Sequence, residues 1–404
     1  MWKNSGWLAA LCLVCLLESV QAAGWLGHLE SRVQADNHYG EHDQFIQHWG
    51  EFSYEHNDNL QLGIAAAARV GIAGIEGQLQ QAWLRKTWPH RKYSLLAGRF
   101  EQADLSGFYA LDGARLEHQR EQWSWRAYAG VRRQIEYFVA QTEKPDEPSH
   151  ALLGLETEYK HKRLSARLGF EHHATNPSGD LFNLDINRQF DKLHLSTAAS
   201  LDVHHHQIEH FLIRTQSAMD WAERPVHFTF SYETYQPLNP LLSFRQRFYR
   251  LYARGRQSGL SARAQYKTQK DDLWRVEGRK LWRDFGDSGY AVSIDWQSHK
   301  PQRWQSRLDC LTLADEKAIN WFVALEKPLS SRHLATFSSV IQWKHSQLLK
   351  PNWATGASVN LKYKYQRDMF INFFAEYIAQ TQMDNQYQLG IQIQYDFYAK
   401  RYRP

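Results

Sequence analysis

Cysteine is scarce in this chain, which has three in 404 residues. Cys12 and Cys15 lie in the first 22 residues, so a chain that loses this segment keeps only Cys310. A single cysteine forms no internal disulfide. Cys310 falls in an alternating segment, and we expect it to be a small packing residue.

Long apolar runs are missing too. After the N-terminal segment no stretch approaches roughly 18 consecutive apolar residues, the length that a spanning helix needs. No stretch of about 12 or more residues shows a convincing helical period. No low-complexity linker divides the chain. We therefore expect one domain without spanning helices.

The N-terminus has the three parts of a cleaved export signal. Lys3 supplies the positive charge, Trp7 to Leu17 is an apolar run too short to span a bilayer, and Val20-Gln21-Ala22 offers small residues for cleavage. We expect residues 1–22 to be removed, so the protein is predicted to be exported.

Strict alternation of apolar and polar residues is the strongest pattern in the chain. In the segment 387–397 one face carries Leu389, Ile391, Ile393, Tyr395 and Phe397, and the other carries glutamines, Gly390 and Asp396. Successive side chains of a strand point to opposite faces, so this segment is predicted to be a strand with one apolar and one polar side.

The same alternation recurs along most of the chain, over lengths of about 9–11 residues, which is what a tilted strand needs to cross a bilayer. Expected strands include 25–35, 44–55, 60–70, 74–86, 93–99 and 304–313. Turn residues separate the strands at 56–59, 191–192, 258–259, 284–288 and 367–368.

An exported chain built only of strands can span a membrane only by closing on itself, because lipid pairs no backbone hydrogen-bonding group. We predict an all-β fold: a single closed antiparallel transmembrane β-barrel over residues 23–397, followed by a short basic tail over 398–404. About 22 strands are expected, within a range of roughly 18 to 24, with short periplasmic turns and no plug domain.

The mean hydropathy of −0.62 is compatible with this fold, because lipid-facing residues occupy only alternate positions. Aromatic residues make up 14% of the chain, enough for girdles at both membrane interfaces. The longer connections, Ala103–Gly113, Ile135–Ser149 and Tyr235–Ser243, are expected to be extracellular loops.

The last strand resembles the C-terminal assembly signal of Gram-negative outer-membrane barrels. The signal has a polar residue, a glycine two positions later, an apolar residue three after that, and aromatics at alternate positions; the matching residues are Gln388, Gly390, Ile393, Tyr395 and Phe397. The resemblance implies a porin-like barrel in the outer membrane of a Gram-negative bacterium, inserted by the assembly machinery and surrounded by outer-membrane lipid.

A ring of this width cannot be filled by its own side chains, so the polar positions are expected to line a water-filled lumen of mixed charge. The predicted lumen-lining residues are Arg126, Arg132, Arg167, Glu171, Arg263, Lys267, Asp295, Lys344, Lys362, Lys364 and Glu376. An equally simple interpretation is that these are solvated positions without a role in selectivity.

The favoured function is an outer-membrane channel for small hydrophilic solutes. The formal charge of +5 is compatible with anionic solutes but too small to indicate nucleic acid. The alternative is a barrel that sheathes a periplasmic or lumenal partner, such as a multihaem cytochrome or a lipoprotein. The hairpin from Leu96 to Arg115 resembles a Gly-Arg…Asp-Gly hairpin of some porin-like proteins, sheaths among them, and Arg99 is expected to pair with Asp112; a structural clasp is the favoured interpretation of this hairpin.

We expect no enzyme activity and no cofactor. The mature chain contains no Gly-x-Ser-x-Gly, His-Glu-x-x-His or Cys-x-x-Cys-His motif. An outer-membrane hydrolase with a lipid-facing Ser/His pair or a rim Asp/His arrangement is a third, disfavoured interpretation, because such barrels have only about 10 to 12 strands. We predict no metal site; the weak candidates for one are His204, His205, His206 and His210, at a predicted turn.

Overall fold

The computed structural model describes residues 25–37, 43–57, 59–71, 74–105, 107–133, 150–174, 179–221, 224–236, 256–284, 288–298, 302–313, 316–346, 349–381 and 385–398. The predicted signal segment lies outside the described residues, and of the predicted tail only Tyr398 is described, as the last residue of a strand.

The described chain is built almost entirely of strands. They are β1 (Trp25–Asp36), β2 (Asp43–Asn57), β3 (Leu60–Gly71), β4 (Gly74–Trp88), β5 (Tyr93–Asp104), β6 (Gly107–Arg120), β7 (Trp123–Arg133), β8 (His150–His161), β9 (Leu164–Ala174), β10 (Gly179–Gln189), β11 (Leu193–Asp202), β12 (Gln207–Trp221), β13 (Arg224–Tyr235), β14 (Gln257–Lys267), β15 (Leu273–Arg283), β16 (Gly289–Ser298), β17 (Arg303–Thr312), β18 (Glu316–Pro328), β19 (His333–Ser346), β20 (Leu349–Gln366), β21 (Met369–Gln380) and β22 (Gln386–Tyr398). A short 3₁₀ helix, η2 (Pro89–Arg91), follows β4. Within the described ranges no helix is long and apolar enough to cross a membrane.

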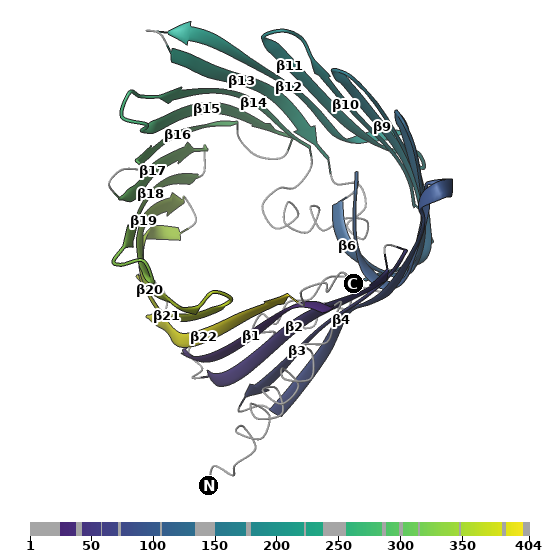
Figure 1. The fold of residues 1–404 in the computed structure, drawn as a ribbon. Coiled ribbons are helices and arrows are strands. Elements are labelled where there is room, and N and C mark those ends of the chain that lie inside the picture. Colours follow the sequence, from purple (N-terminus) through teal and green to yellow (C-terminus); the bar gives the residue numbers. More distant parts are fainter. Residues whose placement is uncertain are drawn as a thin grey trace.

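Each strand pairs antiparallel with the strands before and after it in the sequence, and the ring closes where β1 pairs with β22 (Figure 1). The closing ladder runs from Leu26 opposite Tyr398 to Asp36 opposite Gln388. The predicted closed antiparallel barrel is thus confirmed, with 22 strands. Closure pairs the first strand with the last. The ladder between β4 and β5 is shorter than the others and joins only Ala82–Trp88 to Tyr93–Arg99.

The two faces of the wall differ as the alternation predicts. On β22, Leu389, Ile391 and Ile393 are exposed on one face, here called the apolar face. The opposite face carries Gln388, Gly390 and the following glutamines, and is called the polar face. The pairing register extends both faces around the ring, because directly paired residues lie on the same face.

The connections at the two ends of the barrel differ in length. At the end that contains the first residue of β1 and the last residue of β22, no connection is longer than the five residues between Lys267 and Leu273. We call this end the short-turn end. The strands that the two longest connections join, β7 to β8 and β13 to β14, end and begin at the opposite end, which matches the predicted short periplasmic turns.

Two local predictions were wrong. Ala103–Gly113 is not a loop, because β5 continues to Asp104 and β6 begins at Gly107. Ser258-Gly259 is not a turn, because both residues pair with β13 and β15 inside β14. In each place glycine has a role within the sheet. Of the other two predicted loops, residues 135–149 and 237–243 lie outside the described residues.

Aromatic side chains pack together on the apolar face at the short-turn end. The ring centroids are 4.2 Å apart for Tyr93 and His118, 4.7 Å for Trp123 and Tyr159, and 6.2 Å for Trp274 and Trp296. This arrangement is typical of the aromatic girdle at a membrane interface.

Candidate functional site on the polar face

The tip of the β5–β6 hairpin folds back over the polar face of the wall. We call the residues 99–105 and 107–112 the flap. The register places Ser94, Glu117 and Arg126 in one row across β5, β6 and β7. Ala103 lies nine residues further along β5, about 30 Å away in an extended strand. Even so, Arg126 Nη1 donates a hydrogen bond to the Ala103 carbonyl oxygen at 3.2 Å. Only a flap that bends back toward Arg126 makes this contact possible.

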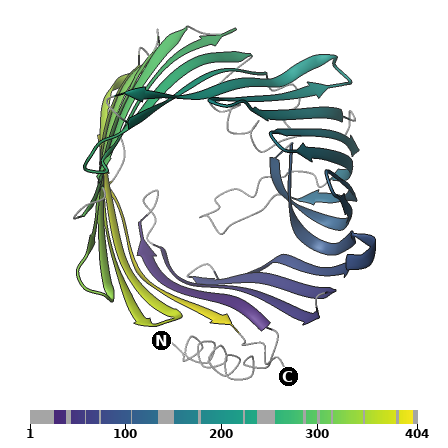
Figure 2. The ribbon, with the colours of Figure 1, turned by 45° about the horizontal axis from the view of Figure 1, so that its top comes forward.

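Two further contacts fix the position of the flap. The Tyr128 hydroxyl on β7 donates to the Asp104 carboxylate at 3.2 Å. Leu105 reaches β9, where a Cβ placed on Gly169 would lie 3.4 Å from Leu105 Cδ1. β5 and β9 are not neighbours in the sheet, so the tip lies on top of the intervening strands. Figure 1 labels β6 inside the ring, and Figure 2 shows part of the same region, drawn in blue, bending inward.

A row of three glycines marks the line where the sheet bends. Gly98 on β5 lies opposite Gly113 on β6, which lies opposite Gly130 on β7. A Cβ on Gly113 would lie 2.1 Å from the Ala129 carbonyl oxygen, and one on Gly98 would lie 2.2 Å from the Ala82 carbonyl oxygen. Gly98 also has a φ of 115°, which side chains disfavour. Only glycine allows the backbones to approach this closely.

The flap encloses a small hydrophobic core within the barrel. It consists of Leu96, Phe100, Tyr109, Leu111, Tyr128 and Leu152, with Trp83 packed against it. Leu111 is fully buried, and Tyr109 is 2% exposed. Burying side chains of this size contributes about 1.5–3 kcal/mol each. The flap is therefore packed against the wall as part of the fold.

Charged groups next to this core are paired. Glu156, 3% exposed, accepts from Arg126 Nη2 at 3.2 Å and lies 3.4 Å from Arg167 Nη1. Glu171 accepts from the Tyr128 hydroxyl at 3.1 Å and lies 3.1 Å from His173 Nε2. A buried carboxylate without such partners would be costly, so these pairs hold the wall beneath the flap in one arrangement.

The predicted Arg99–Asp112 pair is confirmed. Arg99 Nε donates to Asp112 Oδ1 at 2.6 Å and Nη2 to Oδ2 at 2.8 Å, a two-pronged contact at the base of the flap. Arg133 Nε donates to the same carboxylate, and Arg99 Nη1 donates to the Leu79 carbonyl oxygen of β4 at 2.7 Å. Together these contacts tie β4, β5, β6 and β7 next to the bend.

The register assigns all the predicted lumen-lining residues to the polar face, and most have a partner there. Arg126 and Arg167 meet at Glu156, and the Arg132 guanidinium lies 4.5 Å from the Tyr109 ring centroid. Elsewhere on the polar face the contacts join Arg263 to Glu277, Lys267 to Asp271, Asp295 to Gln305, Lys344 to Glu316, and Lys362 and Lys364 to the Phe370 ring. Glu376 lies opposite Ser358 and Gln388. The structure therefore brings Arg126 and Arg167 together at Glu156 and places Glu171 and Arg132 against Tyr128 and Tyr109 of the flap core. The other predicted residues lie elsewhere around the ring.

A second feature of the polar face is a hollow of about 250 Å³ across β12–β15, which we call the polar hollow. Its lining residues are Arg214, Gln216, Thr229, Ser231, Glu233, Gly259, Ser261, Arg263, Glu277 and Arg279. None of these has an apolar side chain. Of this group only Arg263 was predicted from the sequence, because the others become neighbours only through the register of four strands.

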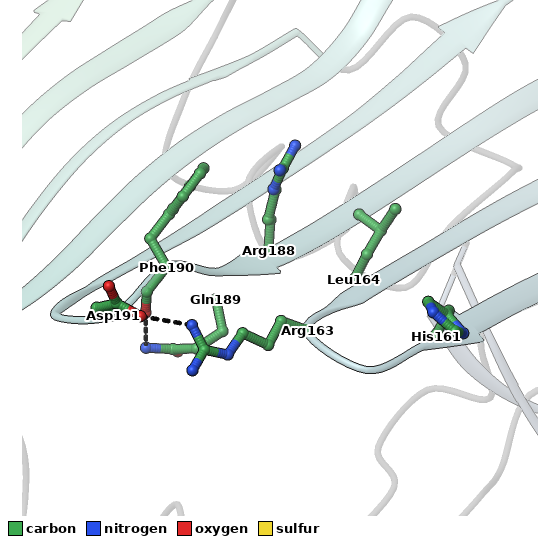
Figure 3. A pocket seen from close by; sticks show the side chains of 7 residues that line it. All are labelled: His161, Arg163, Leu164, Arg188, Gln189, Phe190 and Asp191. Carbon is green, nitrogen blue, oxygen red and sulfur yellow. Dashed lines mark hydrogen bonds and ion pairs between the residues drawn. The ribbon is translucent and has the colours of Figure 1, made fainter.

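A shallower hollow of about 420 Å³ lies at the short-turn end, between the β8–β9 and β10–β11 turns (Figure 3). Arg163 Nη1 donates to Asp191 at 2.6 Å across it, and the Arg188 guanidinium lies 4.9 Å from the Phe190 ring centroid. Arg163 and Asp191 are both largely exposed, so this hollow is open to solvent.

The candidate histidines do not form a ligand set. His205 Nδ1 lies 3.0 Å from Asp202, and His210 Nε2 lies 3.2 Å from Glu233 on another strand. His204 packs edge-on against His205, and His206 lies at the turn with a φ of 53°. Among the described residues no group of three His, Cys, Asp or Glu side chains could hold a metal ion.

The apolar face carries a Ser/His pair. Ser31 Oγ and His48 Nδ1 lie 2.9 Å apart on β1 and β2. On the next strand in each direction, Ser31 lies opposite Ile393 of β22 and His48 lies opposite Ala68 of β3. Neither Ile393 nor Ala68 offers an acid or amide that could orient the imidazole of His48. The pair satisfies two polar groups on an apolar surface, and no described feature makes it a catalytic centre.

No protein-family model and no curated protein matches the sequence. Solved structures of β-barrels do match the fold. The P pilus usher PapC translocation pore aligns over 93% of this chain and 99% of its own, with 7% identity and a TM-score of 0.50. OccAB3 of Acinetobacter baumannii (92% and 99% covered, 9% identity, TM-score 0.44) and OprD of Pseudomonas aeruginosa (93% and 97%, 10%, 0.42) also align. The chain thus shares the large closed barrel fold of the PapC pore.

Proposed function

We propose that this protein is a porin-like channel of the Gram-negative outer membrane that passes small hydrophilic solutes, anionic ones among them. The observation that carries the proposal is the closed ring of 22 strands with opposite surfaces. One surface exposes large apolar side chains around the ring, as a lipid-facing surface does. The other carries arginines, lysines and carboxylates, which suit a water-filled bore.

The flap supports a channel over a sheath. A barrel with more than about 16 strands leaves a wide aqueous lumen. Here the flap lies inside the ring, packed on the wall by Leu111 and Tyr109, and occupies room that a lumenal partner would need (Figure 2). A narrowed bore lined by charges favours small hydrophilic solutes. The remaining partners of the proposal are outer-membrane lipid and the assembly machinery that would recognise Gln388, Gly390, Ile393, Tyr395 and Phe397 on β22.

The test is conductance in planar bilayers. Purified protein that shifts its gel mobility on heating should conduct ions in discrete steps, with mild anion preference in the reversal potential. Replacing Lys362 and Lys364 by Glu should shift the reversal potential toward cations, because neither lysine has a described acidic partner. Lys192→Glu, in the turn between β10 and β11, is the matched control. A folded barrel that stays electrically silent would refute the channel.

A further inference from the structure

The polar hollow on β12–β15 has the build of a solute site. Two rows of side chains cross the four strands: Arg214–Ser231–Ser261–Arg279, and Gln216–Thr229–Arg263–Glu277. In the first row the two serines in the middle form a floor between Arg214 and Arg279, and in the second row Thr229 is the short residue beside Arg263. The hollow exists because Ser231, Ser261, Thr229 and Gly259 are small where their neighbours are long.

The floor offers hydrogen-bonding hydroxyls. Ser231 Oγ and Ser261 Oγ are 2.7 Å apart and bond to each other across β13 and β14. Each hydroxyl keeps further donor or acceptor capacity toward the hollow. Gly259 makes room for the Arg279 side chain, since a Cβ there would lie 2.9 Å from Arg279 Nε. Arg279 therefore lies over the floor.

The charges of the hollow are only partly matched. Arg263 donates to Glu277 with its Nε at 2.8 Å and has its partner. Arg279 is 3.9 Å from Glu233, a long contact, and Glu233 also lies 3.2 Å from His210. No described carboxylate lies within ion-pair distance of Arg214. The guanidinium groups of Arg214 and Arg279 thus lie on either side of the serine floor, and the described carboxylates around them leave room for a further anion.

We propose that the polar hollow binds a small organic carboxylate that also carries hydroxyl or amino groups, such as a sugar acid. The carboxylate of the solute binds between Arg214 and Arg279, whose planar guanidinium groups donate hydrogen bonds to its two oxygens. Hydroxyl groups of the solute bond to the serine floor and donate to Glu233 and Glu277. The volume of about 250 Å³ lies just below the roughly 300 Å³ at which drug-sized sites begin, so the solute is a single small unit.

The site is built for weak binding. Arg263 and Arg279 have side chains 49% and 42% exposed, and ion pairs of exposed groups contribute only about 0–1 kcal/mol each. A solute that crosses a channel must also leave its binding site, so its binding has to be weak. This inference rests on the proposed channel function, and it names the class of solute that the channel wall binds.

Gluconate is the probe, and its binding is measured in two ways. Titration of the detergent-solubilised barrel, followed by saturation-transfer NMR, should give saturable millimolar binding that uncharged sorbitol lacks. In bilayers, gluconate should reduce the open-channel current in a concentration-dependent way. Arg214→Gln and Arg279→Gln should each weaken binding about three- to fivefold, whereas Lys192→Gln, in the turn between β10 and β11, should leave it unchanged.

The outcomes separate the two proposals. Saturable binding of gluconate that Arg214→Gln leaves unaltered would overturn the assignment of the hollow, and so would equal binding of sorbitol. A barrel that conducts but neither binds gluconate nor is blocked by it overturns the solute class and leaves the channel standing. A barrel that binds gluconate through Arg214 but passes no current supports the site and refutes the channel.

Discussion

Gly113 and Gly130 face each other on β6 and β7 so closely that a Cβ on Gly113 would lie 2.6 Å from the Gly130 Cα. Two extended backbones at ordinary spacing keep Cα atoms well apart from a neighbour's Cβ. The contact shows where the sheet leaves the cylindrical surface of the barrel and turns toward its axis. On β5 and β6, the residues beyond this line, 99–105 and 107–112, form the flap.

Replacing Gly113 by Val tests the bend. The side chain would overlap the Ala129 carbonyl oxygen, so the sheet must straighten and lift the flap, or the barrel loses roughly 3 kcal/mol or more of stability. Single-channel conductance and the heat-shifted gel fraction report the two outcomes. Gly77→Val is the control, because a Cβ there meets nothing within 4 Å. Conductance and stability both unchanged in Gly113→Val would contradict the bend.

The flap position can be tested by cross-linking. Leu105→Cys with Gly169→Cys, in a Cys310→Ser background, should join rapidly with a short bifunctional maleimide, because the two positions touch. Cleavage of the chain between them, read on a gel, identifies the link. Leu105→Cys with Gly356→Cys on β20 is the matched pair, for which no link is expected. Equal yields from both pairs would place the tip elsewhere.

The buried carboxylate beneath the flap should depend on its arginines. Arg126→Met leaves Glu156 with one partner instead of two, and loss of a partner from a buried pair costs roughly 3 kcal/mol. Urea unfolding in lipid vesicles, followed by gel mobility, measures this loss. Arg163→Met is the comparison, because the exposed Arg163–Asp191 pair should contribute about 0–1 kcal/mol. Equal losses in the two variants would mean that Glu156 is solvated.

The Ser31–His48 hydrogen bond on the apolar face should stabilise the barrel modestly. Interhelical hydrogen bonds in lipid couple by about 0.6 kcal/mol on average, and a similar value is expected here. The double-mutant cycle of Ser31→Ala and His48→Phe, measured as unfolding free energies in vesicles, isolates this coupling.

The wild-type protein is also expected not to hydrolyse phospholipids. A measurable hydrolysis abolished by Ser31→Ala would make the pair catalytic.

The sequence pattern was sufficient for the fold because alternation is a local property. In β22 the position of each residue from Leu389 to Asp396 shows which face it lies on. The first four strands were predicted within two residues of their ends, whereas the fifth, predicted over 93–99, continues to Asp104. The pattern failed where glycine had another purpose. Gly259 leaves room for Arg279, and Gly113 allows close backbones, yet both were interpreted as turn or loop residues.

The site was less predictable because it depends on register and on bending. Arg214 and Arg279 are separated by three strand pairings, and no local pattern states which residues of β12 and β15 share a row. The Arg99–Asp112 pair was found because both residues belong to one hairpin. The row Gly98, Gly113 and Gly130 was present in the sequence and, interpreted through hairpin pairing, would have indicated the bend.

Gly390 has a packing role in the barrel that does not depend on the predicted assembly signal. Its match to the assembly signal remains a prediction. In the barrel a Cβ at this position would lie 2.5 Å from the Phe374 ring and 2.5 Å from the Val33 carbonyl oxygen. The glycine is therefore needed for β22 to fit between β1 and β21, whatever recognises the segment before insertion.

The seam between β1 and β22 joins the first and the last described strands of the barrel. His28 and Asp396, 368 positions apart in the chain, lie 2.5 Å apart across it. β22, the partner that closes the ring on β1, follows all the other described strands in the sequence and is therefore synthesised after them. We expect a polypeptide truncated before β22 not to close into a smaller barrel. β1 and β21 would each have an unpaired edge, and these edges would pair with those of another copy and cause aggregation.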